Sequence, residues 1–152
     1  MAATTMKLVF GSDVRLVDVA HAASERLAGV AGFDEDDALN VGIAVREAVI
    51  NAITHGNKRD PKRKVEVILK AGPRSLEARV RDQGAGFDPS RTQDPTTADN
   101  VLNTSGRGLL LIRAFVDSVD FKFREGRGME VVLVKRRVSR GTLQDVSSSA
   151  RP

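Results

Sequence analysis

The feature of this sequence that most restricts its fold is a pair of alternating segments in the middle of the chain. Residues 64–70 and 76–80 place apolar side chains at every second position, and Ala71-Gly-Pro-Arg-Ser75 separates them. Alternation with period two is typical of strands that bury one face. The two segments are therefore expected to form a hairpin whose apolar face needs a covering layer.

Helical periodicity before the hairpin supplies such a layer. Apolar residues recur at steps of three and four between Val14 and Val30, which predicts an amphipathic helix that ends near residues 29–32. The four carboxylates at positions 34–37 favour the start of a second helix, because they stabilise the positive end of its dipole. We expect that helix to run to about His55 and to stop at Gly56.

The remaining segments complete the predicted sheet and its cover. Residues 7–10 predict an edge strand and residues 109–116 a short apolar helix, whereas residues 119–123 and 129–134 predict two strands joined by a tight turn. Residues 87–105 predict a long irregular loop, and loops of this length are often lids. The order favours an α+β fold, a two-layer sandwich in which helices cover one face of a mixed, mostly antiparallel sheet.

The length and composition of the chain suit one domain. Its 152 residues are 41% hydrophobic and include no cysteine, which excludes thiol catalysis and a disulfide framework. We expect the folded domain to span residues 1–137 and the Ser-rich residues 138–152 to form a disordered, basic tail. No apolar stretch approaches the roughly 20 residues of a membrane span, and no secretion signal is evident, so the sequence predicts a cytoplasmic location without membrane contact.

The excess positive charge lies at the C-terminal end. A formal charge of +4 and a pI of about 9.8 suggest nucleic-acid binding, although the chain has six Phe and neither Trp nor Tyr to stack on bases. Residues 135–152 carry five basic residues and one acidic residue, so residues 1–134 are neutral overall. The net positive charge therefore belongs to the C-terminal segment and not to the predicted domain, and direct nucleic-acid binding is not expected.

Three polar residues form a line on the second predicted helix. Glu47, Asn51 and His55 lie four residues apart, which places them on one stripe of an α-helix whose other faces are apolar. Beside a cleft, Asn51 can supply an oxygen to Mg²⁺, and Glu47 can accept a proton from a hydroxyl group. The same residues also fit an ordinary exposed strip of an amphipathic helix.

Two glycine motifs follow the hairpin. Asp82 ends a strand and precedes Gly84 and Gly86, so the backbone can approach a ligand while the carboxylate accepts a hydrogen bond from an amino group. Residues 104–108, Thr-Ser-Gly-Arg-Gly, precede the Leu-rich helix and offer N–H groups and the Arg107 cation to a phosphate. Residues 104–108 match neither a Walker loop nor a Rossmann fingerprint. Each motif also fits a plain glycine turn.

Taken in order, the three motifs resemble the N, G1 and G2 boxes of the Bergerat-type ATPases, which have the histidine-kinase-like ATPase fold. That superfamily includes gyrase, histidine kinases and mismatch-repair ATPases. More narrowly, residues 44–57, 80–89 and 106–113 are similar to the anti-sigma-factor serine/threonine kinases of bacterial stress and sporulation switches. The similarity spans about residues 7–136 and therefore covers nearly the whole predicted domain.

The resemblance implies a role for each motif. Asp82 would bind the adenine amino group, in a base pocket shaped by Gly84 and Gly86. Asn51 would coordinate the Mg²⁺ that bridges the phosphates, and Glu47 would act as general base toward a serine of a partner protein. The other residues expected to hold the nucleotide are His55, Thr104, Ser105, Gly106, Arg107 and Gly108.

The implied function is that of an ATP-dependent protein-serine kinase and anti-sigma factor, which binds a sigma factor as a homodimer and phosphorylates an anti-sigma antagonist. Three alternatives stay open. A nucleotide-responsive module could bind a regulatory protein without catalysis, although Glu47 and Asn51 count against it. The ATPase part of a sensor histidine kinase would need a preceding phosphoacceptor helix, for which the six residues before Lys7 leave no room. Plain nucleic-acid binding is the third alternative.

Overall fold

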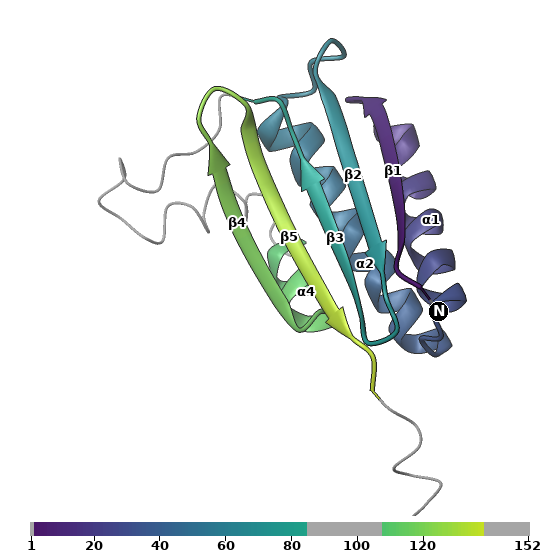
Figure 1. Ribbon diagram of the computed structural model, residues 1–152. Helices are drawn as coiled ribbons and strands as arrows, with labels where there is room; N and C mark the ends of the chain where they lie inside the picture. The colour runs from purple at the N-terminus through teal and green to yellow at the C-terminus, as the bar shows by residue number, and fades with distance from the viewer. Residues whose placement is uncertain (1, 85–107, 139–152) are drawn as a thin grey trace, which may run out of the picture.

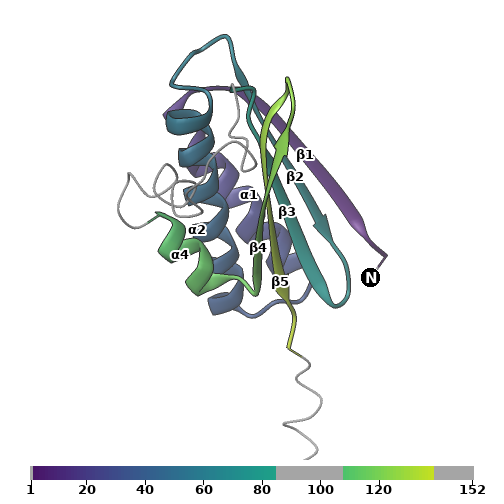
Figure 2. The same cartoon turned by 90° about the vertical axis from the view of Figure 1, so that its left-hand side faces the viewer.

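The part of the chain that the computed structural model describes, residues 2–84 and 108–138, folds into one sheet and one layer of helices. Its strands are β1 (Thr4–Gly11), β2 (Lys64–Ala71), β3 (Ser75–Arg81), β4 (Ser118–Arg124) and β5 (Gly128–Arg136). They form a sheet in the order β1-β2-β3-β5-β4, and every pairing between them is antiparallel. Figures 1 and 2 show helices on one face of this sheet, which confirms the predicted α+β sandwich.

The central hairpin of β2 and β3 buries one face, as its alternation predicts. Val67 pairs with Val80 and Leu69 with Ala78, and these four side chains are at most 1% exposed. Burying a Val or Leu side chain contributes about 1.5–3 kcal/mol, so this face supplies much of the core energy. The intervening positions of both strands point to the opposite, helix-free face of the sheet.

Two helices, α1 (Val17–Val30) and α2 (Glu35–Asn51), cover the apolar face, and a short 3₁₀ turn, η1 (Val14–Leu16), precedes α1. Asp34 caps α2, because its side chain accepts a hydrogen bond of 2.8 Å from the backbone N–H of Asp37. The predicted helix start at the acidic segment is therefore confirmed. α2 packs against β3 and β5, and its fully buried side chains include Val41, Val45 and Val49.

A third helix, α4 (Gly108–Phe115), lies beside α2 and buries Leu109 and Ile112. Its position confirms the short apolar helix predicted for this part of the chain. The turn between β4 and β5 contains Gly126 at φ 71°, a conformation that favours glycine. None of the described helices is long and apolar enough to cross a membrane.

The end of the second helix differs from the prediction. Regular α-helix was expected to about His55, but it ends at Asn51 and continues as one π-helical turn, η2 (Ala52–Gly56). The backbone N–H of Asn57 donates to the carbonyl of Ala52, five residues earlier, at 2.8 Å. A π turn has more residues than an α turn, so His55 does not continue the stripe of Glu47 and Asn51 with α-helical geometry. Such turns frequently occur at functional sites.

Candidate functional site

Asp82 occupies the point where β3 leaves the sheet. Its backbone N–H donates to the carbonyl of Met129 on β5 at 3.0 Å, which extends the ladder between the two strands by one residue. Its carboxylate oxygen Oδ1 accepts hydrogen bonds from the backbone N–H groups of Gly84 at 3.0 Å and Met129 at 3.2 Å. The side chain is therefore fixed by two main-chain donors, and the residue is only 5% exposed.

Three glycines close around Asp82. A Cβ on Gly56 would overlap the Asp82 carboxylate, and a Cβ on Gly84 would overlap the carbonyl of Gly56. A Cβ on Gly128 would lie 2.6 Å from Asp82 Oδ1, and this residue also has a φ of 101°. The buried carboxylate and its turn therefore fit only because the neighbouring positions in η2, in the loop after β3 and at the start of β5 are glycines.

Burial affects the pKa of Asp82. The loss of hydration raises the pKa of its carboxyl group above the ordinary value, and the hydrogen bonds from Gly84 and Met129 oppose that effect only in part. A buried acceptor of this kind has a high affinity for a donor, because little hydration is lost when a ligand binds it. An amino group presented to Asp82 is a suitable donor.

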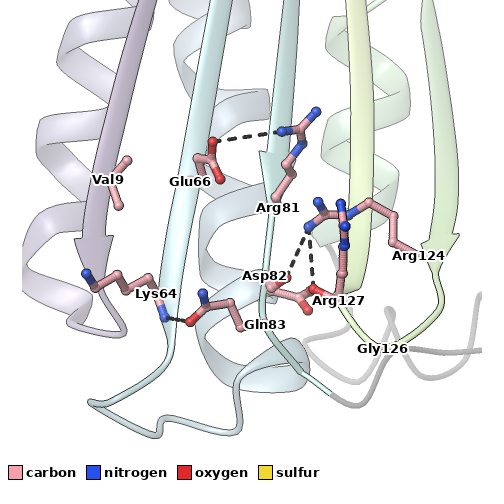
Figure 3. Close-up of a pocket in the computed structure, with 9 residues that line it drawn as sticks. All are labelled: Val9, Lys64, Glu66, Arg81, Asp82, Gln83, Arg124, Gly126 and Arg127. Atoms are coloured by element: carbon pink, nitrogen blue, oxygen red, sulfur yellow. Dashed lines mark hydrogen bonds and ion pairs between the residues drawn. The ribbon is translucent and has the colours of Figure 1, made fainter.

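An open cavity of about 320 Å³ lies beside Asp82 on the helix-free face of the sheet (Figure 3). Val9, Glu66 and Arg81 line it, and they alternate with the core-facing residues of their strands. Arg124 reaches across it to the main-chain carbonyl of Asp82 at 3.4 Å. Asp82 itself lines this cavity, whereas Glu47 and Asn51 come from α2 in the opposite layer and do not line it.

Charged side chains on the helix-free face hold β3 against β5 next to Asp82. Glu130 is 3% exposed and bonds Arg81 and Arg79, with 3.2 Å to the Arg79 guanidinium. Burial alone would raise the pKa of Glu130, but the two arginines outweigh it and hold this pKa below the ordinary value. The ionised network therefore fixes the register of the two strands that carry Asp82 and Met129.

Asn51 is buried at the end of α2, with 4% of its surface exposed. Its carbonyl oxygen Oδ1 has no hydrogen-bond partner in the described part of the molecule. Leaving such an oxygen unpaired costs about 1–3 kcal/mol, and a hard cation that prefers oxygen ligands would remove that cost. Asn51 thus fits a Mg²⁺ ligand and is not part of an exposed strip. Glu47 lies one turn earlier and is half-buried.

The described residues offer no protein-only metal centre, since they contain no group of three or more His, Asp or Glu side chains suited to a metal ion. A Mg²⁺ ion at Asn51 would accordingly take most of its oxygen ligands from a bound phosphate group or from water. This is the usual way in which Mg²⁺ accompanies a nucleotide.

Residues 10–135 match the model of the histidine kinase-like ATPase domain. The chain belongs to the histidine kinase-like ATPase family. The anti-sigma F factor of Oceanobacillus iheyensis is 31% identical to it, over 66% of this chain and 70% of its own. The serine-protein kinase RsbW of Bacillus velezensis is 33% identical, over 76% and 79% of the two chains. The serine-protein kinase RsbW of Bacillus subtilis is 30% identical, over 72% of each chain.

Membership of the histidine kinase-like ATPase family confirms the resemblance inferred from the three motifs. The structure brings Asp82 and Gly84 together with Gly56, the residue after His55, and it places Gly108 in a buried position at the start of α4. His55 is half-buried within η2. The predicted lid at residues 87–105 and the other predicted site residues lie outside the described ranges; these are Gly86, Thr104, Ser105, Gly106 and Arg107.

Sequence reasoning did not identify two residues of this arrangement. The sequence predicts Gly56 as a helix stop within the first motif segment and Gly128 as the end of the turn before β5, but it predicts no contact with Asp82, and both residues lie against it. The position of Gly56 directly after the helical polar motif is the one signal that the sequence offers for it. Nothing in the sequence around Gly128 indicates that the start of β5 lies beside the end of β3.

Proposed function

We propose that this protein is an ATP-dependent protein-serine kinase and anti-sigma factor, which acts in the cytoplasm as a homodimer, binds a sigma factor and phosphorylates an anti-sigma antagonist. One observation carries the proposal. On α2, a half-buried carboxylate, Glu47, precedes by one turn a buried and unpaired amide oxygen, that of Asn51. Relatives named serine-protein kinase and anti-sigma F factor, at about 30% identity, support the choice of substrate and partner.

Recognition of the adenine base is assigned to Asp82. Its carboxylate is a buried acceptor with a raised pKa, and the exocyclic amino group of adenine is a donor of matching polarity. Guanine presents a carbonyl oxygen at the corresponding position, and two acceptors repel each other. The site should therefore prefer ATP to GTP.

Binding of the phosphates is assigned to Asn51 and to the N-terminal end of α4. Mg²⁺, when bound, would neutralise part of the negative charge of the phosphates. Asn51 Oδ1 would hold that ion, and the backbone N–H groups at the N-terminal end of α4, which begins at Gly108, would face the phosphate oxygens. The proposed phosphate ligands Gly106 and Arg107 immediately precede this helix in the sequence.

Catalysis is assigned to Glu47, which would accept the proton of the antagonist's serine hydroxyl as that oxygen attacks the γ-phosphorus. The P–O bond to the β-phosphate breaks, and ADP leaves. Phosphoryl transfer depends mainly on positioning and on charge neutralisation, so one carboxylate, one metal ligand and a helix terminus form a sufficient set of groups.

The direct test is an assay of phosphate transfer. The protein is incubated with Mg-ATP and its cognate antagonist, and the antagonist is examined by mass spectrometry for phosphoserine. We expect one phosphate on a single serine of the antagonist. Glu47→Gln should abolish transfer but retain ATP binding, because it keeps the size of the side chain and removes only the base.

Two results would contradict the proposal. If the parent protein transfers no phosphate to the cognate antagonist, it is not the kinase of that partner. If, in addition, the parent and Glu47→Gln release a bound sigma factor equally well on addition of antagonist and ATP, the chain acts as a nucleotide-responsive binding module without catalysis.

A further inference from the structure

Asn57, immediately after η2, is a fully buried polar residue at the end of the first motif segment, and the sequence gives it no definite role. Both hydrogens of its carboxamide nitrogen are used: Nδ2 donates to Ser12 Oγ at 2.9 Å and to the carbonyl of Lys64 at 3.0 Å. Its oxygen Oδ1 accepts from the backbone N–H of Gln83 at 2.7 Å. One side chain therefore connects the loop after β1, the start of β2 and the loop after β3.

The bond to Gln83 reaches the centre of the site. Gln83 lies between Asp82, which holds the buried carboxylate, and Gly84, whose N–H bonds that carboxylate at 3.0 Å. The Gln83 side chain points away from this turn, toward the backbone N–H of Lys64 at 2.6 Å (Figure 3). Asn57 thus fixes the main chain of the turn from one side, and Lys64 fixes the Gln83 side chain from the other.

The neighbour of Asn57 in the chain adds a second link. Gly56 lies against the Asp82 carboxylate and under Gly84, so residues 56 and 57 together contact the whole turn from Asp82 to Gly84. The π turn sets the position of Asn57, whose backbone N–H bonds Ala52 at 2.8 Å. The end of α2, which carries Asn51, is thereby joined through a few residues to the turn that carries Asp82.

We propose that Asn57 is a positioning residue for base recognition, which sets the orientation of Asp82 toward adenine by holding the backbone of Gln83. The proposal rests on the nucleotide site described under Proposed function. It assigns the two ends of the carboxamide different tasks. The Nδ2 end joins Ser12 and Lys64 and stabilises the fold, whereas the Oδ1 end orders the turn that binds the base.

These two tasks can be separated by a matched pair of variants. Asn57→Ala removes the hydrogen bonds at both ends. Ser12→Ala removes one of the two hydrogen bonds of Nδ2, together with the bond of 2.8 Å from Ser12 Oγ to the carbonyl of Arg63, and leaves the bond from Nδ2 to Lys64 in place. Both changes should lower Tm. Only Asn57→Ala should weaken Mg-ATP binding, by about fivefold to tenfold, which is the effect of losing one hydrogen bond of ordinary net strength.

A purely structural role of Asn57 would leave base discrimination unchanged, that is, the ratio of the dissociation constants for Mg-GTP and Mg-ATP. Dissociation constants for Mg-ATP and Mg-GTP are measured by calorimetry on the full-length parent and on both variants, well below the Tm of each. We expect the preference for ATP to fall severalfold in Asn57→Ala and to stay within twofold of the parent in Ser12→Ala. If Asn57→Ala does not fold, Asn57→Ser, whose shorter side chain cannot reach Gln83, is expected to show the same loss of preference.

Each outcome has one interpretation. Equal losses of ATP affinity in the Asn57 and Ser12 variants, or an unchanged ATP preference in both Asn57 variants, would overturn the positioning role. Asp82→Asn serves as the reference for the site itself. If that variant binds Mg-ATP like the parent, the proposed base pocket is wrong, whereas a loss in Asp82→Asn without a loss in Asn57→Ala refutes only the role of Asn57.

Discussion

Gly56 lies against the carboxylate of Asp82, so closely that a Cβ at position 56 would overlap it. The two residues belong to different elements, one to the π turn after α2 and the other to the end of β3. Their contact joins the helix layer to the sheet at the point where the nucleotide is proposed to bind. It also means that the carboxylate is covered by backbone atoms on the side of η2.

The first prediction concerns this contact. Gly56→Ala should displace Asp82, weaken Mg-ATP binding by more than about tenfold and lower Tm, because overpacking a filled site costs about 1–3 kcal/mol. Gly29→Ala is the control, since an added Cβ meets nothing within 4 Å there. Gly29 lies inside α1, so its replacement by Ala should stabilise the protein by about 0.5–1 kcal/mol without affecting ATP binding. Equal ATP affinity in both variants would show that the contact has no role in binding.

The second prediction follows from the burial of Asp82. Asp82→Asn keeps an oxygen for the N–H groups of Gly84 and Met129 but removes the buried charge. The Asn variant should therefore melt a few degrees above the parent at neutral pH, since about 1 kcal/mol shifts Tm by about 2–4 °C in a chain of this length. It should lose the Tm increase that Mg-ATP gives the parent, because its amide nitrogen would face the adenine amino group.

The stability difference between these two proteins should depend on pH. The pKa of Asp82 is higher in the folded state than in the unfolded state, where it is near 3.8. The side chain therefore makes its full contribution to the free energy of unfolding below the unfolded pKa and loses it as the pH rises through the folded pKa. The advantage of Asp82→Asn should thus grow as the pH rises above the unfolded value near 3.8. Melting curves over this range test it, and a constant difference would contradict the assigned cause.

The third prediction concerns Glu130 and has the opposite sign. The pKa of Glu130 is lowered by Arg81 and Arg79, so its stabilising effect is present above the unfolded value near 4.5 and is lost as pH falls through the folded value. Glu130→Gln should destabilise the protein by about 1–3 kcal/mol at neutral pH, because two arginines lose their shared carboxylate. The cost should shrink in acid, as chemical denaturation at several pH values would reveal.

Glu77→Gln is the matched control for Glu130. Glu77 pairs with Arg79 at 2.6 Å, but about a third of its side chain is exposed, so solvent screens the pair. Its replacement should cost less than about 1 kcal/mol. If both substitutions cost the same, burial of Glu130 is not the source of its stabilising effect.

The sequence predicted the parts of the fold that depend on local periodicity. The alternation in residues 64–80 gave the buried hairpin, and the carboxylate of Asp34 marked the start of α2, because side-chain spacing and capping act over a few residues. The resemblance of the three motifs to a known family also indicated Asn51 and Asp82 as candidate nucleotide-site residues. These predictions needed no knowledge of which strands become neighbours.

The features that the sequence did not predict depend on distant contacts. Strand β5 inserts between β3 and β4, so Met129 and Gly128 come to lie beside Asp82 although 46 and more residues separate them along the chain. The π turn was not predicted, because no local pattern in residues 52–56 distinguishes it from the last turn of an α-helix. The turn places Asn57 among three segments that are contiguous only in the folded protein, and no local pattern encodes those contacts.

The fourth prediction concerns the unpaired oxygen of Asn51. Asn51→Leu, close in volume, should leave the apo protein as stable as the parent or raise its Tm, because it removes a buried acceptor that lacks a partner. In the parent, Mg²⁺ should strengthen ATP binding relative to ATP with EDTA. In the variant this enhancement should disappear, since the proposed ligand is gone. Calorimetric titrations with and without Mg²⁺ measure both affinities.

A variant that keeps the full Mg²⁺ enhancement would exclude Asn51 as the metal ligand, whereas a large loss of Tm would mean that the buried oxygen is already paired in the apo protein.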